Sequence, residues 1–123
     1  MTKEQENIKR LAEGVMRWKR VATYDDLTTS QNTYLVTTNG YININNGGSE
    51  TGFFDPFNYN ADAWMLESCM VKLLPLHVEI ALFGGQWFYS LPDQDATEAS
   101  MHECRRTALC NFCLAWLDAR ERK

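Results

Sequence analysis

The segment Phe54–Trp64 constrains the fold of this chain most strongly, because it joins a turn to the start of an apolar helix. Pro56 favours an extended conformation for the residue before it. Asn58 and Asn60 favour a turn and a helix N-cap, since a short amide side chain can accept the unpaired N–H groups of the first helical turn. We therefore predict a helix over residues 61–74, with a proline directly after it.

The composition is that of an ordinary globular protein, with 45% hydrophobic and 23% charged residues. A length of 123 residues fits one domain, residues 1–123. The net charge of −4 argues against duplex nucleic acid as a partner, because binding it requires a basic face. No apolar run reaches the roughly 20 residues that span a bilayer, and residues 1–7 lack a signal-peptide core. We therefore predict a cytoplasmic protein with no membrane partner, whose four cysteines are free thiols.

A helix is expected over residues 3–19, ahead of a polar and irregular stretch over 21–32. Gly14 weakens this helix by about 1 kcal/mol relative to alanine and allows close packing at that point. The helix carries one apolar stripe, made of Ile8, Leu11, Ala12, Val15 and Met16.

A polar hairpin follows, because Asn39-Gly40 is a strong signal for a two-residue turn between strands over 33–38 and 41–45. The polar composition places this hairpin at a sheet edge or over a pocket. A two-residue turn puts four residues on one face, namely Leu35, Thr37, Ile42 and Ile44.

The clearest strand signal comes after the central helix, in a hairpin that turns at Gly84-Gly85. Its strands are apolar on one face and mixed on the other, so the sheet requires cover on both faces. The cross-strand pairs expected on the apolar face are Leu82–Trp87, Ile80–Tyr89 and Val78–Leu91.

The last helix is expected over residues 95–120, and between Ala108 and Leu117 only Asn111 is strongly polar. A helix that is apolar all round is buried all round, and so small a domain is not expected to surround it. We therefore predict a homo-oligomer that forms through the outer face of this helix. The alternative is a monomer in which the two earlier helices cover it. Together the elements predict an α+β fold, an α-β-α sandwich with a small antiparallel sheet of two hairpins flanked by three helices.

Three blocks of the sequence form a recognisable series. The first is Leu-Ala-Glu-Gly-Val-Met-x-Trp over residues 11–18, and the second is Phe-x-Pro-x-Asn-x-x-Ala-x-Ala-Trp over 54–64. The third is Cys-Arg-Arg-Thr-Ala-Leu over 104–109, after a strand that carries Trp87. Together they resemble the phage ABA-sandwich domain family of small, mostly uncharacterised phage-encoded proteins. The resemblance leaves residues 20–52 largely unmatched.

The resemblance implies a phage origin and a small sandwich in which helices flank an antiparallel sheet. It implies no established activity. This chain departs from the family pattern at Gly14, where a longer polar residue is usual, and at Arg106, where a small residue is usual. The extra arginine is a candidate for a binding role that is specific to this member.

Arginine and aromatic side chains are the candidate ligand-binding residues, because a guanidinium donates paired hydrogen bonds to phosphate and a ring stacks on a base or sugar. Arg105 and Arg106 are adjacent on a helix and point about 100° apart, so they cannot share one face. The alternative for each is an intramolecular partner such as Glu67, Glu79 or Glu103. The predicted ligand-binding set is Arg105, Arg106, Asn58, Tyr59, Trp87 and Tyr41.

Other chemistries have less support, and we predict no catalytic residue, metal or cofactor. Cys110 and Cys113 have the spacing of a metal or redox pair, but cysteines within an apolar helix are usually core residues. His77 and His102 lack the hydroxyl residues of paired His-x-Ser/Thr phosphodiesterase motifs, and His102 is expected on the last helix. The glycine-rich loop over 47–52 lacks a Walker lysine.

These observations favour a phage-encoded, non-enzymatic protein that sequesters a small nucleotide-derived molecule, such as a host immune signal. Oligomer interfaces supply the concave sites that a small monomer lacks, and the protein would act in the cytoplasm of the infected bacterial host. One alternative is an inhibitor of a host enzyme that binds it through an exposed hairpin over 34–45. Another is a nucleotide-degrading phosphodiesterase, with His77 or His102 as acid or base.

Overall fold

The computed structural model describes residues 2–29, 32–44, 53–74, 78–91 and 101–121. Along these ranges the elements are α1 (Lys3–Gly14), β1 (Lys19–Arg20), α2 (Tyr24–Thr29), β2 (Thr33–Val36), β3 (Ile42–Ile44), α3 (Asn60–Leu73), β4 (Glu79–Phe83), β5 (Gln86–Ser90), β6 (Met101–His102) and α4 (Arg105–Glu121). The predicted α+β class is confirmed. His77 and the glycine-rich loop over 47–52 lie outside the described residues.

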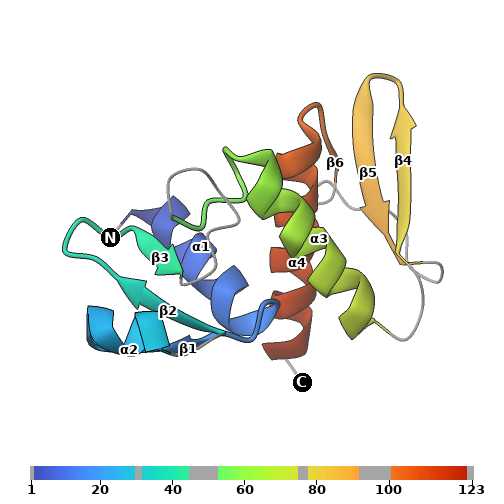
Figure 1. Ribbon diagram of the computed structural model, residues 1–123. Helices are drawn as coiled ribbons and strands as arrows, with labels where there is room; N and C mark the ends of the chain where they lie inside the picture. Colours follow the sequence, from blue (N-terminus) through green and yellow to red (C-terminus); the bar gives the residue numbers. More distant parts are fainter. Residues whose placement is uncertain (1, 30–31, 45–52, 75–77, 92–100, 122–123) are drawn as a thin grey trace.

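The strands form two separate three-stranded sheets, and helices α3 and α4 lie between them (Figure 1). In the first sheet, β1 runs parallel to β2 and β3 runs antiparallel to it. The second sheet is antiparallel, with β5 between β4 and β6. The two predicted hairpins therefore both form, but each belongs to its own sheet.

α1 begins with a capping box, in which the Thr2 hydroxyl accepts the N–H of Gln5 and the Gln5 side chain accepts the N–H of Thr2. The helix ends at Gly14, earlier than the predicted residue 19, because the chain turns out of the helix and Arg17 adopts a left-handed φ of 59°. A Cβ atom at Gly14 would lie 2.5 Å from a Leu117 methyl carbon, so the glycine permits the close approach of α1 to α4.

The stretch over 21–32, predicted to be irregular, contains the short helix α2. Its start is stabilised by Thr23, whose hydroxyl accepts the N–H of Asp26 and donates to the Asp26 carboxylate. Leu27 is the buried residue of this helix. The prediction missed it because α2 has too few residues for a helical repeat of apolar positions to show.

α3 agrees with the predicted helix over 61–74, but its N-cap is different. Tyr59 occupies the cap position without a side-chain hydrogen bond, so the predicted capping by Asn58 or Asn60 is wrong. Aspartate side chains stabilise the turn instead, through hydrogen bonds to its backbone. The buried Asp62 carboxylate accepts the N–H of Asp55 at 2.9 Å, and the Asp55 carboxylate accepts the N–H of Phe57 at 3.2 Å.

The first hairpin has a three-residue loop, and its predicted register is wrong by one residue. Thr37 donates its N–H to the Tyr41 carbonyl, and Gly40 takes the left-handed conformation at φ 84°. Tyr34 pairs with Ile44 and Val36 with Ile42. Because a slip of one residue exchanges the two faces of a strand, the residues that share a face are Tyr34, Val36, Ile42 and Ile44, in place of the predicted Leu35 and Thr37.

The second hairpin has the predicted register, with Leu82 opposite Trp87 and Ile80 opposite Tyr89. Gly84 and Gly85 both have positive φ, as a two-residue turn of this type requires. The predicted cover is incomplete, however. Every residue of β4 is exposed, whereas Tyr89 in β5 is buried.

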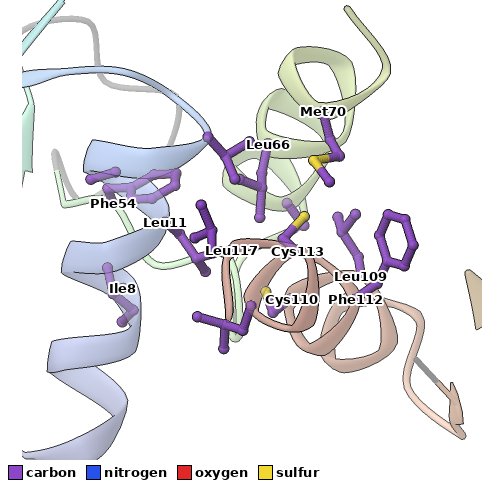
Figure 2. Packing of buried hydrophobic residues seen from close by; sticks show 14 of the residues in the cluster. Ile8, Leu11, Phe54, Leu66, Met70, Leu109, Cys110, Phe112, Cys113 and Leu117 are labelled. Atoms are coloured by element: carbon purple, nitrogen blue, oxygen red, sulfur yellow. The ribbon is translucent and has the colours of Figure 1, made fainter. Parts of the chain in front are cut away.

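α4 is the centre of the hydrophobic core, and one connected buried cluster joins it to the other elements. Figure 2 shows its side chains meeting Ile8 and Leu11 of α1 on one side and Leu66 and Met70 of α3 on another. Arg10 of α1 adds an ion pair to Asp118 at 2.7 Å. The buried residues of α4 are Ala108, Leu109, Cys110, Phe112, Cys113, Leu114 and Leu117.

Two predictions about the last helix are therefore wrong. α4 begins at Arg105 and not near residue 95, and His102 lies on strand β6, not on the helix. α4 also gives no reason for self-association, because a single chain covers its apolar faces with α1, α3 and the second sheet. The homo-oligomer itself stays a prediction. The predicted cover by the two earlier helices is confirmed for α1 and α3, and the second sheet adds to it.

Candidate functional site

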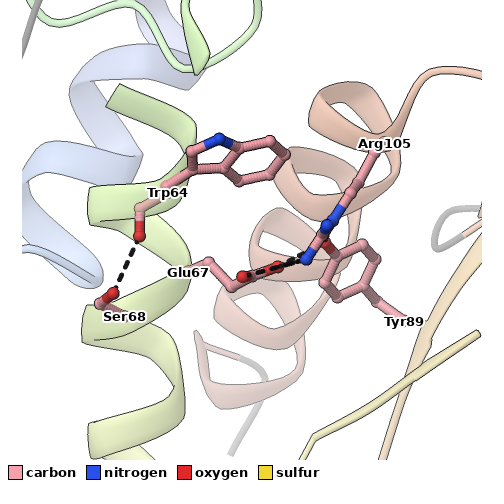
Figure 3. Close-up of polar contacts among 5 residues, drawn as sticks. All are labelled: Trp64, Glu67, Ser68, Tyr89 and Arg105. Atoms are coloured by element: carbon pink, nitrogen blue, oxygen red, sulfur yellow. Dashed lines mark hydrogen bonds and ion pairs between the residues drawn. The ribbon is translucent and has the colours of Figure 1, made fainter. Parts of the chain in front are cut away.

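Arg105, the first residue of α4, sits at the centre of a polar and aromatic cluster that joins α3, α4 and β5 (Figure 3). Its guanidinium donates from Nε to the Tyr89 hydroxyl at 2.9 Å and from Nη2 to both carboxylate oxygens of Glu67, at 3.1 and 3.3 Å. The Tyr89 hydroxyl donates to Glu67 at 2.5 Å. The guanidinium carbon also lies 4.6 Å from the centre of the Trp64 ring and 5.0 Å from that of Trp87.

This Arg105 cluster works as a structural anchor. The hydrogen bond to Tyr89, followed by that to Glu67, raises the pKa of Arg105, so the guanidinium stays charged. Burial and the Glu67 hydrogen bond raise the pKa of Tyr89. Arg105 has its charge matched within the chain, because its guanidinium bonds the Glu67 carboxylate and lies near the Trp64 and Trp87 rings. The intramolecular alternative, with Glu67 as the partner, is therefore the one observed.

Arg106 points in a different direction and binds the turn before α3. Its Nε donates to the Phe57 carbonyl at 3.1 Å, and its Nη1 donates to the Asn60 side chain at 2.6 Å. The predicted residues Asn58 and Tyr59 lie between these two acceptors in the sequence and are exposed. Arg106 therefore fixes the shape of the turn.

Two other predicted residues, Tyr41 and Asn58, line one hollow of about 300 Å³ at the start of α1. Tyr41 is half-exposed and stacks on Phe53, with ring centres 5.0 Å apart. We call this site the Tyr41 hollow. Its walls come from α1, the β2–β3 turn, β3 and the segment before α3, and its lining residues are Thr2, Glu4, Gln5, Ile8, Gly40, Tyr41, Ile42, Phe54, Asp55 and Asn58.

The polar wall of the Tyr41 hollow carries negative charge. Asn58 donates one side-chain hydrogen bond to Glu4 at 3.2 Å and another to Asp55 at 2.8 Å, and so brings the two carboxylates together. Gln5 donates to the Asn39 carbonyl at 3.0 Å and joins α1 to the hairpin turn. The lining residues include two carboxylates and no arginine or lysine, so the wall suits a ligand that offers hydrogen-bond donors.

The predicted ligand-binding set is thus divided among three places in the structure. Arg105 and Trp87 belong to the Arg105 cluster, Arg106 holds the turn beside Tyr59, and Tyr41 meets Asn58 in the hollow. Glu4 and Gln5 were not predicted, because they reach the hollow from the first turn of α1, which is distant in the sequence. Their hydrogen bonds to Asn58 and Asn39 span 54 and 34 residues of sequence.

The remaining candidate residues have structural roles. Cys110 and Cys113 are buried thiols whose pKa is raised by burial, as expected for core cysteines. His102 is exposed, and its Nδ1 accepts the N–H of Cys104 at 2.9 Å. Across the described ranges, no group of three or more histidine, cysteine or acidic residues is arranged to hold a metal ion. No helix in the described part of the chain has the length and apolarity needed to cross a bilayer.

Comparison with known proteins adds no relative to this description. No protein-family model matches the chain, and the curated proteins and solved structures gave no significant match. The resemblance to the phage ABA-sandwich family therefore stays a prediction from the three sequence blocks.

Proposed function

We propose that this chain is a non-enzymatic binding protein that holds a small molecule in the Tyr41 hollow. The observation that carries the proposal is the meeting of an aromatic face with hydrogen-bonding side chains, Tyr41 with Asn58, around a space of about 300 Å³. That volume is at the lower end of the range for small-molecule sites. Tyr41 is held in place by its stacking on Phe53, which reduces the cost of ordering it around a ligand.

The charge of the wall narrows the class of ligand. Glu4 and Asp55 repel a phosphate at neutral pH and accept hydrogen bonds from amino and imino groups. Arg105 and Arg106, the residues predicted to bind phosphate, bind other parts of the chain. The hollow therefore suits the base of a nucleotide-derived molecule, stacked on Tyr41 and bonded at its edge, with any phosphate directed to solvent.

This proposal keeps the sequestering role and changes its chemistry. In the cytoplasm of an infected host, a protein of this kind would withdraw a nucleotide-derived signal by holding its base. Support for the phage setting comes from the sequence resemblance, and support for the base from the hollow. The alternative of an inhibitor acting through the hairpin over 34–45 has less support, because Tyr34, Ile42 and Ile44 of that hairpin are buried.

Isothermal titration calorimetry with a panel of nucleosides and their 5′-phosphates tests the proposal. We expect binding of at least one nucleoside, and weaker binding of its phosphates as phosphates are added. Tyr41→Ala should weaken binding at least about fivefold, since stacking of a base on an aromatic ring contributes about 1–3 kcal/mol. Tyr24→Ala is the matched control, because Tyr24 is also an exposed tyrosine and lies on α2, away from the hollow lining.

A charge reversal in the wall separates base recognition from phosphate recognition. Glu4 is exposed on the first turn of α1, so Glu4→Lys should preserve the fold and shift the preference toward the phosphorylated ligands. If no nucleoside binds, or if phosphates bind most tightly and Arg106→Ala removes that binding, the proposed site is wrong.

A further inference from the structure

Strand β4 is an apolar edge that the described part of the chain leaves open. All five of its residues are exposed, and Ile80, Leu82 and Phe83 keep 37%, 57% and 77% of their surface accessible. Among the described strands, β4 pairs with β5 alone. In Figure 1, β4 forms the outer margin of the molecule, with β5 between it and the helices. Exposed apolar edges of this kind are templates for pairing with another strand.

The register of the hairpin identifies which backbone groups point outward. A two-residue turn joins Phe83 to Gln86, which makes these two a hydrogen-bonded pair. Bonded and non-bonded pairs alternate along an antiparallel ladder. Ala81 therefore directs its N–H and C=O groups to β5, and Ile80 and Leu82 direct theirs away from it. The two residues with outward backbone groups also carry exposed apolar side chains.

We propose that β4 pairs with β4 of a second copy of this chain, antiparallel and across a two-fold axis at Ala81. In this register Ile80 of each copy lies opposite Leu82 of the other, and both exchange backbone hydrogen bonds. Ala81 faces Ala81 of the second copy as a non-bonded pair at the axis. The two second sheets then form one continuous sheet of six strands.

The features of β4 match a second copy, because a two-fold contact requires one strand to complement itself. The outward backbone groups are symmetric about Ala81, which satisfies that requirement. The register also separates the like charges, since Glu79 lies opposite Phe83 of the second copy and not opposite Glu79. A chain with a net charge of −4 can therefore meet its copy at this strand without direct repulsion.

The available area indicates a weak, concentration-dependent dimer. The three large side chains of β4 expose roughly 300 Å² of apolar surface per copy, taking about 150–250 Å² for a large side chain. A standard interface buries about 800 Å² per partner. We therefore expect association in the micromolar range or weaker. The proposed dimer contact is separate from the Tyr41 hollow, because β4 lies on the other side of α3 and α4 from β3 (Figure 1).

Cysteine cross-linking tests the register directly. In a Cys69→Ser, Cys104→Ser background, Ala81→Cys places two thiols at the two-fold axis, where Cα atoms of a non-bonded pair are about 4.5 Å apart. That separation suits a disulfide, and mild oxidation should yield a covalent dimer. Glu79→Cys is the matched control on the same strand. Its two copies would be roughly 13 Å apart, so we expect it to cross-link at least about tenfold more slowly.

Sedimentation velocity on the unmodified chain tests the association itself. Between about 5 and 500 µM, the mass should rise from 14.2 kDa toward twice that value. Leu82→Lys should keep the chain monomeric, because a charge at a strand edge blocks pairing, and Tyr24→Lys should leave association unchanged. Circular dichroism confirms that each variant is folded. A chain that stays monomeric overturns the proposal and leaves the edge to a different partner; cross-linking of Glu79→Cys as fast as Ala81→Cys overturns the register.

Discussion

In each of the two sheets, one fully buried tyrosine donates its hydroxyl proton to a glutamate on a neighbouring helix. Tyr34 of β2 binds Glu13 of α1, and Tyr89 of β5 binds Glu67 of α3. Both tyrosines therefore attach the interior of a sheet to a helix by the same pair of side chains. Among the described residues, an arginine binds this pair in the second sheet only, where Arg105 contacts both Tyr89 and Glu67.

The two sheets differ in what lies over their strands. In the first sheet, Ile42 of β3 is only 2% exposed, as it packs in the core with α1 and α4. In the second sheet, α4 covers β5, while Ile80 and Leu82 of β4 stay accessible. The first hairpin has the more polar composition, yet its strand β3 is better covered than β4. The position of the helices decides which apolar strand becomes core and which becomes a surface.

The largest expected effect comes from truncating the same residue type in each sheet. Ile42→Ala should lower the free energy of unfolding by about 3 kcal/mol, because it removes buried methyl groups and leaves a cavity. Ile80→Ala, at a partly exposed site, should cost about 1 kcal/mol or less. Urea denaturation at low micromolar concentration measures both values. Equal losses of stability would mean that β4 is as well packed as β3, and the proposed difference in cover between the two sheets would be wrong.

The second-largest expected effect comes from replacing Arg105, which distinguishes the Tyr89–Glu67 pair from the Tyr34–Glu13 pair. Arg105→Ala should cost about 2 kcal/mol, because Glu67 and Tyr89 lose a charged hydrogen-bonding partner in a half-buried site. Arg105→Lys should recover only part of this, since lysine cannot bond Glu67 and Tyr89 with one planar fork. Arg106→Ala is the control and should cost about 1 kcal/mol, because its acceptors are uncharged. A larger loss for Arg106→Ala would show that the Arg105 cluster is not the main anchor.

The second hairpin was predictable because its turn is fixed locally. The glycine pair at 84–85 adopts positive φ at both positions, and this determines the register of the whole ladder. In the first hairpin, Asn39-Gly40 gave the same signal, but Gly40 closes a three-residue loop against Gln5 of α1. The contact that selects this loop is made with residues far away in the sequence. A pattern of neighbouring residues cannot report it.

The candidate site was predictable only in part, for the same reason. Glu67 could be named as a partner of Arg105 because opposite charges are expected to pair, and the structure confirms it. The rings of Trp64 and Trp87 come from α3 and β5, and only tertiary packing brings them to one guanidinium. The Tyr41 hollow likewise depends on the meeting of α1 with the turn before α3.

Raising the pH tests whether the two tyrosine anchors are equivalent. Burial, with the hydrogen bond to a glutamate, raises the pKa of both Tyr34 and Tyr89. Because the folded pKa is raised, each tyrosine ionises at a lower pH in the unfolded chain than in the folded one. The stability that these hydroxyls contribute is therefore complete below pH 10 and is lost as the pH rises above 10. The loss is up to about 1.4 kcal/mol per pH unit for each tyrosine. Tyr34→Phe and Tyr89→Phe should each cost about 1 kcal/mol at pH 7 and flatten the alkaline decline.

The difference in stability between these two variants tests whether Arg105 strengthens the Tyr89–Glu67 pair. The core cysteines also have a raised pKa and contribute to the alkaline decline in every variant equally. Any difference between Tyr34→Phe and Tyr89→Phe therefore reports the anchors. We expect Tyr89→Phe to cost more at pH 7, because Arg105 also loses its hydroxyl partner. Unfolding curves recorded between pH 7 and 11 measure this, and identical profiles would show that the arginine adds nothing.

The smallest expected effect is at Phe83, the most exposed of the large side chains at the open edge. Phe83→Thr should change the free energy of unfolding of the dilute chain by no more than about 0.5 kcal/mol, because the ring is mostly in water and threonine is favourable in a strand. Tyr41→Thr, at another exposed aromatic ring, provides a control in which stacking on Phe53 is lost. A cost above about 1 kcal/mol for Phe83→Thr in dilute solution would mean that another part of the chain packs on β4. The β4 edge would then be covered within the monomer. The two sheets would differ in which segments cover them, and the second sheet would have no free edge for a partner.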